Sequence, residues 1–172
     1  GTVARAARRA IDFHRGRGDE IVLCTGSTQY ASEVVARALD IEHVLCTRLE
    51  VAAGKFTGKL AAKCFGPHKV TVAEAFARER GIDLAQSWFY SDSIYDTPLL
   101  SAVGHPVVVN PDPRLVVMAS ARGWPRIHLD VPPGVPKIPF LNLEPQQLAM
   151  AFARPELIGY ARFDIAGADR IP

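Results

Sequence analysis

Two hydrophobic patterns alternate along the first 127 residues of the chain. Short apolar runs, typical of buried strands, occur at residues 20–25, 43–51, 87–91 and 105–110. Between them, apolar residues recur every three or four positions, which predicts helices at residues 26–40, 67–81, 96–104 and 112–123. A further helix is expected at residues 3–15 and a last strand at 125–130. The pattern therefore predicts alternating strands and helices.

The residues at the ends of these segments agree with that reading. Pro67 begins one predicted helix and Gly81 ends it, the usual positions for proline and glycine. Asp112 is expected to cap another helix, which Gly123 ends. The segment 54–60 is expected to be extended and to pair with residues 43–51 around a turn at residues 52–54.

Alternating strands and helices predict an α/β fold, with a parallel sheet covered by helices on both faces in a three-layer, Rossmann-like arrangement. From Val131 the composition changes, because residues 131–145 contain five of the 13 prolines. This stretch is expected to be a linker or an arm that wraps the domain. The predicted organisation is a core at residues 1–130, the proline-rich segment 131–145 and a C-terminal segment 146–172.

Composition and charge narrow the possible partners. The 172 residues carry a net charge of +2, too small to indicate nucleic-acid binding. No apolar stretch approaches the roughly 20 residues that span a bilayer, and the start of the chain is amphipathic rather than a signal peptide. Three cysteines, Cys24, Cys46 and Cys64, lack metal-ligand spacing and are expected to be reduced thiols, which favours the cytoplasm.

The first candidate for chemistry is the sequence Thr25-Gly26-Ser27, directly after a predicted strand. Ligands of open parallel sheets bind beyond the carboxyl ends of the strands. A hydroxyl beside a glycine at the start of a helix would point backbone N–H groups and a side-chain donor at one spot, which suits a phosphate. The alternative is a plain strand–helix turn with an N-cap, for which Ser27 or Thr28 would serve.

Two further candidates for chemistry lie at the end of a predicted strand and at the start of a predicted helix. Asp92 and Asp96 follow the strand "SWFY", and carboxylates are the oxygen ligands that Mg²⁺ takes. Asp92 is expected to be a direct ligand and Asp96 to hold a ligand water or orient the loop, unless both are helix caps. Lys69 lies in the first turn of a helix, where a cation is unfavourable unless an anion binds nearby. The alternative for Lys69 is a solvated surface side chain.

These residues resemble the motifs of the haloacid dehalogenase superfamily, in particular its phosphoserine-phosphatase-like branch (subfamily IB). "IVLCTGS" is similar to the second family motif at Thr25, and "GPHK" to the third at Lys69. "YSDSIYD" is similar to the acidic fourth motif, with Ser91 where the family has glycine. The stretch "VVVNPDP" also resembles this branch, and the resemblance runs from about residue 5 to residue 127.

The resemblance implies a Mg²⁺-dependent phosphatase that acts on a small phosphorylated substrate. In that family an aspartate attacks phosphorus to form an aspartyl-phosphate, and a second aspartate acts as general acid and base. Carried onto this chain, Thr25, Gly26 and Ser27 would bind phosphate, and Lys69 would neutralise its charge. Thr25 and Lys69 would thus be the catalytic residues, Asp92 would ligate Mg²⁺, and Asp96 would support that ligation.

The nucleophile motif of the family, Asp-x-Asp, occurs nowhere in the 172 residues. We expect it on a strand upstream of Gly1, in a missing N-terminal segment of a longer parent chain. Most of the cap that this branch inserts before its second motif is also absent. The isolated chain is therefore expected to be inactive or nearly so. It is also expected to expose a sheet edge or a hydrophobic gap where that strand would lie.

The final residues suggest an alternative for the whole protein. "YARFDIAGADRIP" resembles the opening of a 1-acylglycerol-3-phosphate acyltransferase domain. The chain would then be the phosphatase-like half of a bifunctional enzyme of phospholipid synthesis, peripheral to the membrane through the downstream domain. A second alternative, based on the missing nucleophile, is a non-catalytic binding module of the same fold.

Overall fold

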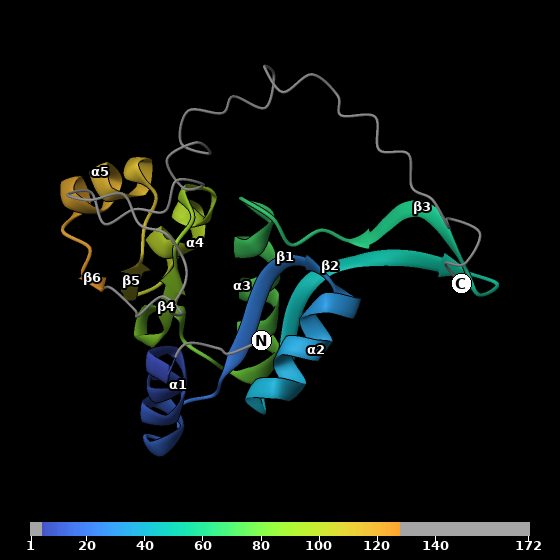
Figure 1. Cartoon of the computed structure of the whole chain (residues 1–172), viewed down its shortest axis with the longest axis horizontal. Coiled ribbons are helices and arrows are strands. Elements are labelled where there is room, and N and C mark those ends of the chain that lie inside the picture. The colour runs from blue at the N-terminus through green and yellow to red at the C-terminus, as the bar shows by residue number, and fades with distance from the viewer. Residues whose placement is uncertain (1–4, 128–172) are drawn as a thin grey trace.

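A computed structural model describes residues 5–127 of the chain (Figure 1). The helices are α1 (Arg5–Gly16), α2 (Gln29–Leu39), α3 (His68–Arg80), α4 (Thr97–Ala102) and α5 (Pro113–Arg122). The strands are β1 (Val22–Thr28), β2 (His43–Ala52), β3 (Lys55–Ala62), β4 (Trp88–Ser91), β5 (His105–Val109) and β6 (Arg126–Ile127). Two 3₁₀ turns, η1 (Leu84–Gln86) and η2 (Ile94–Asp96), flank β4. The predicted alternation of strands and helices is confirmed.

The described strands form two three-stranded sheets, ordered β1-β2-β3 and β4-β5-β6. The pairs β1–β2, β4–β5 and β5–β6 are parallel, which confirms the α/β class and the parallel arrangement. The sequence pattern indicated one parallel sheet, whereas β1 and β4 are each an edge strand in the described part of the chain. Each therefore presents one row of backbone groups without a strand partner from residues 5–127.

The pair β2–β3 is an antiparallel hairpin that projects away from the rest of the molecule (Figure 1). The predicted turn lies at its tip, where Ala53 and Gly54 both have positive φ, at 51° and 75°. Two consecutive positive φ angles are typical of the tight turns that match the twist of a hairpin. Seven of the eight residues of β3 are exposed, so neither face of this strand is covered by the described residues.

Most helix ends agree with the sequence. Helices α3 and α5 end at Gly81 and Gly123, each with φ of 67°, as their glycines predict. The start of α2 differs, because β1 continues to Thr28 and the helix begins only at Gln29. Thr28 occupies the N-cap position of α2, but its side chain makes no capping hydrogen bond.

The C-terminal sheet carries the hydrophobic core of the described residues. Four fully buried side chains from β5, α4 and α5 form one cluster: Leu100, Val108, Leu115 and Ala119. Partly buried side chains pack around them, namely Phe89, Ile94, Met118 and Trp124. The strand β4 and the loop that follows it thus rest on a well-packed base.

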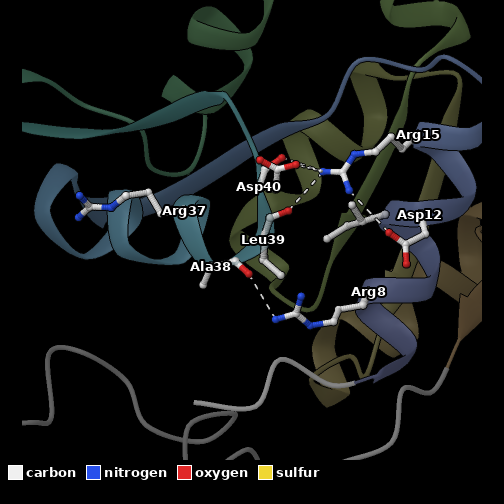
Figure 2. A pocket seen from close by; sticks show the side chains of 8 residues that line it. Arg8, Asp12, Arg15, Arg37, Ala38, Leu39 and Asp40 are labelled. Carbon is white, nitrogen blue, oxygen red and sulfur yellow. Dashed lines mark hydrogen bonds and ion pairs between the residues drawn. The ribbon is translucent and has the colours of Figure 1, made fainter.

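Helix α1 is attached to both parts of the fold. The guanidinium of Arg8 donates to the carbonyl of Ala38, and that of Arg15 to the carbonyls of Leu39 and Asp40 (Figure 2). These bonds satisfy the last carbonyls of α2, which have no partner within their own helix. The residues that make these bonds line a hollow of about 160 Å³. The polar groups in this hollow therefore serve to cap α2. On the other side, the ring of His14 accepts or donates a hydrogen bond with the hydroxyl of Tyr90 on β4, at 2.8 Å.

The predicted linker at 131–145 and the acyltransferase-like segment within 146–172 lie outside the described residues, so both stay predictions. Among residues 5–127, no helix is both long and apolar enough to cross a bilayer.

Candidate active site

Lys69 is buried, with 6 % of its surface exposed, in the first turn of α3. Its Nζ donates a hydrogen bond to Oδ2 of Asp96 at 2.8 Å, and the two form an ion pair. The alternative of a solvated surface lysine is therefore wrong. A buried cation in this position must be compensated by an anion, and Asp96 supplies one from the opposite segment of the chain.

Asp96 accepts a second hydrogen bond, from the hydroxyl of Ser91 at 2.7 Å. It stands at the N-cap position of α4, as the sequence predicts, but its side chain makes no capping hydrogen bond there. Both recorded bonds to the carboxylate end on Oδ2. Asp96 therefore orients Lys69, and Ser91, in the place of the family's glycine, holds Asp96.

Asp92 lies one residue beyond the end of β4 and is exposed. Within residues 5–127, no hydrogen bond or ion pair to its carboxylate is recorded, so its oxygens face solvent. Its backbone is held instead: the N–H of Asp112 donates to the carbonyl of Asp92 at 3.3 Å, and Oδ2 of Asp112 accepts from the N–H of Ile94. The two acidic residues of this loop thus differ, one buried in an ion pair and one open.

Asp112 carries a role that the sequence pattern did not show. Its Oδ1 accepts hydrogen bonds from the N–H groups of Arg114 and Leu115, which confirms the predicted cap of α5. The additional bond of its Oδ2 to Ile94 connects that cap to the acidic loop. A helix cap is recognisable from spacing, but a contact between residues 18 positions apart is not.

Thr25, Gly26 and Ser27 form an irregular stretch within β1. The pairing register of β1 with β2 shifts between Cys24 and Thr28, and the N–H of Ser27 donates to the hydroxyl oxygen of Thr25 at 3.2 Å. Gly26 and Ser27 are exposed and Thr25 is half-buried. The sequence indicated that these residues begin a helix. Since α2 begins only at Gln29, they form instead a bulged strand end.

The segment before α3 packs on this bulge. A Cβ placed on Gly26 would lie 3.2 Å from the ring of Phe65, so the backbone approaches closely there. The ring of Phe65 in turn contacts that of Tyr95, with centroids 5.4 Å apart. The ends of β1, of β4 and the start of α3 therefore meet, which brings the three sequence candidates to one place.

Two cysteines adjoin this meeting point in the sequence, because Cys24 precedes Thr25 and Cys64 precedes Phe65. The Sγ atoms of Cys24 and Cys64 are 3.9 Å apart. The pKa of Cys64 is lowered, first by its hydrogen bond with Cys24 and then by the charge of Lys69 and a hydrogen bond with the Thr25 backbone. All three cysteines are free in the structure, and their reduced state in the protein stays a prediction.

The acidic loop has one carboxylate that is open to a cation, that of Asp92. Within residues 5–127, no group of three or more histidine, cysteine, aspartate or glutamate side chains has the arrangement of a metal site. Asp92 has open carboxylate oxygens, whereas Oδ2 of Asp96 is occupied by Lys69 and Ser91. Mg²⁺ is often held by one or two carboxylates with several waters. The residues therefore fit one direct ligand, with the remaining positions left to water or a substrate.

Sequence comparisons find relatives that are named as phosphatases. It is 40 % identical over 122 residues to a probable phosphatase of Mycobacterium tuberculosis, covering 71 % of this chain and 42 % of that protein. It is 35 % identical over 118 residues to a phosphoserine phosphatase of the same organism, covering 68 % and 38 %. It is 32 % identical over 126 residues to a histidinol-phosphatase of Neisseria meningitidis, covering 70 % and 57 %. The chain thus spans about two fifths of the first relative.

Comparison with solved structures supports the same fold. A Bordetella pertussis protein described as of unknown function matches with a TM-score of 0.66 and 35 % identity. The match covers 70 % of this chain and 56 % of that one. The family pattern of haloacid dehalogenase-like hydrolases matches residues 2–101, which include Thr25, Lys69, Asp92 and Asp96. The chain belongs to the haloacid dehalogenase-like hydrolase family.

Proposed function

We propose that this chain forms the phosphate-binding and metal-binding part of a Mg²⁺-dependent phosphatase for small phosphate monoesters. The observation that carries the proposal is the pairing of buried Lys69 with Asp96, 2.8 Å apart, next to the open carboxylate of Asp92. Asp96 thereby holds the Lys69 cation at the loop after β4 that also carries the open carboxylate of Asp92. A phosphate ester with a bound cation needs this combination of charges.

Each residue has a distinct task in this proposal. The exposed backbone at Gly26 and the hydroxyls of Thr25 and Ser27 would donate hydrogen bonds to phosphate oxygens. Lys69 would offset their charge from within the protein, where a charge acts more strongly than in water. Asp92 would ligate Mg²⁺, which when bound reduces the repulsion between the phosphate and the carboxylates. Asp96 and Ser91 would hold Lys69 in place.

The metal part is tested by titrating the 172-residue chain with Mg²⁺ and measuring the heat of binding. Asp92→Asn should weaken Mg²⁺ binding by at least about tenfold, since it removes the one open carboxylate of the loop. Asp12→Asn removes an exposed carboxylate of α1, away from the loop, and should leave binding unchanged. Equal Mg²⁺ affinity in the parent chain and in Asp92→Asn would contradict the proposed ligand.

The chemical part is tested with an aryl phosphate in the presence of Mg²⁺. We expect no phosphate release from the 172 residues, since they contain no Asp-x-Asp pair to supply the nucleophile and the general acid. Release that requires both Mg²⁺ and Asp92 would mean that another residue attacks phosphorus. Either way, Lys69→Met should weaken the binding of orthophosphate, while Lys59→Met, on exposed β3, should not.

The relatives support a substrate class, though not one compound. They include a phosphoserine phosphatase and a histidinol-phosphatase, and the substrates in these two names are phosphate monoesters of amino alcohols. The motifs at Thr25, Lys69 and Asp92 support our proposal that the chain belongs to the phosphoserine-phosphatase-like branch (subfamily IB). A cytoplasmic location is proposed from the free cysteines.

A second candidate is a module that binds phosphate or a phosphorylated ligand without hydrolysing it. The observation in its favour is the lack of an Asp-x-Asp pair in the 172 residues. Hydrolysis of phosphate esters by a longer parent protein that contains this pair would exclude it.

The fusion to an acyltransferase rests on residues 160–172, and a reading frame that ends near Pro172 would exclude that alternative.

A further inference from the structure

Two of the three thiols are neighbours although they are 40 residues apart in the chain. Cys24 lies on β1 and Cys64 precedes α3, and their Sγ atoms are 3.9 Å apart. Cys64 has 0 % exposure, and Cys24 is half-buried. Among the described residues the third thiol, Cys46, is buried and has no recorded contact with another thiol. The structure therefore singles out one pair.

The two thiols of this pair differ in acidity. The hydrogen bond with Cys24, the charge of Lys69 and a hydrogen bond with the backbone of Thr25 lower the pKa of Cys64. The hydrogen bond with Cys64 and burial raise the pKa of Cys24. Cys64 is thus the more acidic thiol of the pair and is expected to react first, after loss of its proton, while Cys24 is placed to resolve the product.

We propose that Cys24 and Cys64 form a peroxide-sensitive dithiol whose disulfide changes the conformation of residues 25–27. The Cys64 thiolate attacks one oxygen of hydrogen peroxide, the O–O bond breaks, and a sulfenic acid and hydroxide form. The Cys24 sulfur then attacks the Cys64 sulfur, the S–O bond breaks, and water leaves with the Cys24 proton. The hydroxide takes up the proton that the Cys64 thiol released, so the two thiols lose two electrons in total and the peroxide becomes two waters.

The geometry connects this bond to the bulge of β1. The sulfurs must approach from 3.9 Å to about 2.05 Å. Cys64 and Cys24 are the neighbours of Phe65 and Thr25 in sequence, and the Phe65 ring packs so close to Gly26 that a Cβ placed there would lie 3.2 Å from it. Drawing the two segments together therefore pushes the Phe65 ring against residues 25–27, where the register of β1 is already irregular.

The inference goes beyond the proposed function and does not depend on it. Disulfide formation is a property of the two sulfurs and can be measured in a chain without phosphatase activity. If residues 25–27 also bind phosphate, oxidation would weaken that binding, but this consequence is not needed for the test. Failure of phosphate binding and failure of the dithiol would thus be seen in different measurements.

The chain permits a direct map of the pairing, because trypsin places each cysteine on a separate peptide. The expected peptides are 18–37 with Cys24, 38–48 with Cys46 and 64–69 with Cys64. The folded chain would be treated with hydrogen peroxide, alkylated, digested without reductant and analysed by mass spectrometry. The treatment must be prolonged, because the burial of Cys64 slows the first step.

We expect peptides 18–37 and 64–69 to be joined, with a mass lower by two hydrogens than their sum. The same treatment in guanidinium, where the fold is lost, should give all three pairings. Equal pairings in the folded and the denatured chain, or free Cys24 and Cys64 after treatment, would overturn the proposal.

Two variants separate the roles of the thiols. In Cys24→Ser the sulfenic acid cannot be resolved, so a cyclic 1,3-diketone should label peptide 64–69. In Cys64→Ser the same reagent should label neither peptide 18–37 nor 64–69. The Cys46→Ser variant should form the disulfide like the parent chain. In Cys24→Ser, equal labelling of Cys46 and Cys64 would show that the local environment of Cys64 does not raise its reactivity, which would contradict the proposal.

The conformational part is tested by amide hydrogen exchange of the reduced and the oxidised chain. Residues 25–27 should exchange at a different rate after oxidation, and the Cys24→Ser variant treated with peroxide should not show the change. Unchanged exchange in an oxidised chain with a mapped Cys24–Cys64 bond would refute the effect on this segment while leaving the disulfide itself established.

Discussion

The two sheets of the molecule are built differently. The C-terminal region, which we define as residues 88–127 with β4–β6, α4 and α5, buries large side chains in one cluster. The N-terminal region, residues 22–62 with β1–β3 and α2, buries mainly small side chains and a thiol: Ser32, Ala36, Ile41 and Cys46. It leaves large apolar side chains at least 39 % exposed, namely Tyr30, Val34, Val35, Val51, Phe56 and Leu60.

The difference in packing implies that the two parts of the candidate site differ in rigidity. Asp92 and Asp96 stand on the well-packed region, and Asp112 fixes their loop through two backbone contacts. The Thr25 segment stands on the other region, where the strand is irregular and the hydrogen bonds are local. Regions with few buried apolar contacts are the ones that open most readily. We therefore expect the metal side to be more rigid than the phosphate side.

The largest expected effect comes from the ion pair that joins α3 to the C-terminal region. Asp96→Asn should lower the free energy of unfolding by roughly 3–5 kcal/mol, because it leaves the buried charge of Lys69 without a partner. Urea denaturation monitored by circular dichroism would measure the change. The matched control is Asp92→Asn, four residues earlier and exposed, which should change stability by at most about 0.5 kcal/mol. Equal effects of the two variants would mean that the pair is not buried in solution.

A leucine in each region tests the contrast in packing. Leu100→Ala should cost about 2–5 kcal/mol, since Leu100 has 0 % exposure in the core cluster. Leu60→Ala, in β3 with 51 % exposure, should stay within about 0.5 kcal/mol. The same urea titration measures both. A cost for Leu60→Ala close to that for Leu100→Ala would show that a further part of the chain covers the hairpin.

The sequence predicted the elements of both regions, but not how they are packed. Periodicity depends on local spacing, and it placed the helices and the strands within a few residues of their observed ends. The end of β1 was missed because Gly26 and Ser27 are typical of a turn, while pairing with β2 resumes at Thr28. Whether a strand face is covered depends on distant residues, so the exposure of β3 could not be read from its sequence.

Helix caps offer a smaller test of the same contrast. Asp112→Ala should cost about 1–2 kcal/mol, because its side chain accepts from two N–H groups of α5. Thr28→Ala should cost much less, because Thr28 makes no capping hydrogen bond to α2. Denaturation of the two variants side by side measures the difference. Comparable losses would show that Thr28 caps α2 in solution.

Motif spacing likewise located the candidate site without its internal contacts. Thr25, Lys69, Asp92 and Asp96 were found because the sequence pattern placed each of them directly after a predicted strand or at the start of a predicted helix. Their assigned roles stay predictions. The contact of Lys69 with Asp96 spans 27 residues, and the supporting bond from Ser91 replaces a glycine of the family motif. No local pattern gives such contacts, since they depend on how the two regions meet.

The smallest expected effect concerns the attachment of α1 to the C-terminal region. The hydrogen bond from His14 is the main cause that lowers the pKa of Asp19 below its ordinary value of 3.8, and Arg17 adds to it. A carboxyl with a lowered folded pKa stabilises the protein above the unfolded pKa. This contribution is lost as the pH falls through the folded pKa. Stability should therefore decrease below about pH 4 as Asp19 is protonated.

The test is the free energy of unfolding as a function of pH, from about pH 6 to about pH 2. Asp19→Asn should flatten the acid limb of this curve by the part that Asp19 contributes. Tyr90→Phe removes the other hydrogen bond of His14 but no group that ionises in acid, so it should lower the whole curve and keep the slope. If Asp19→Asn kept the slope of the parent chain, the bond between Asp19 and His14 would not persist in solution. Helix α1 would then be held chiefly by Arg8 and Arg15, on the side of the N-terminal region.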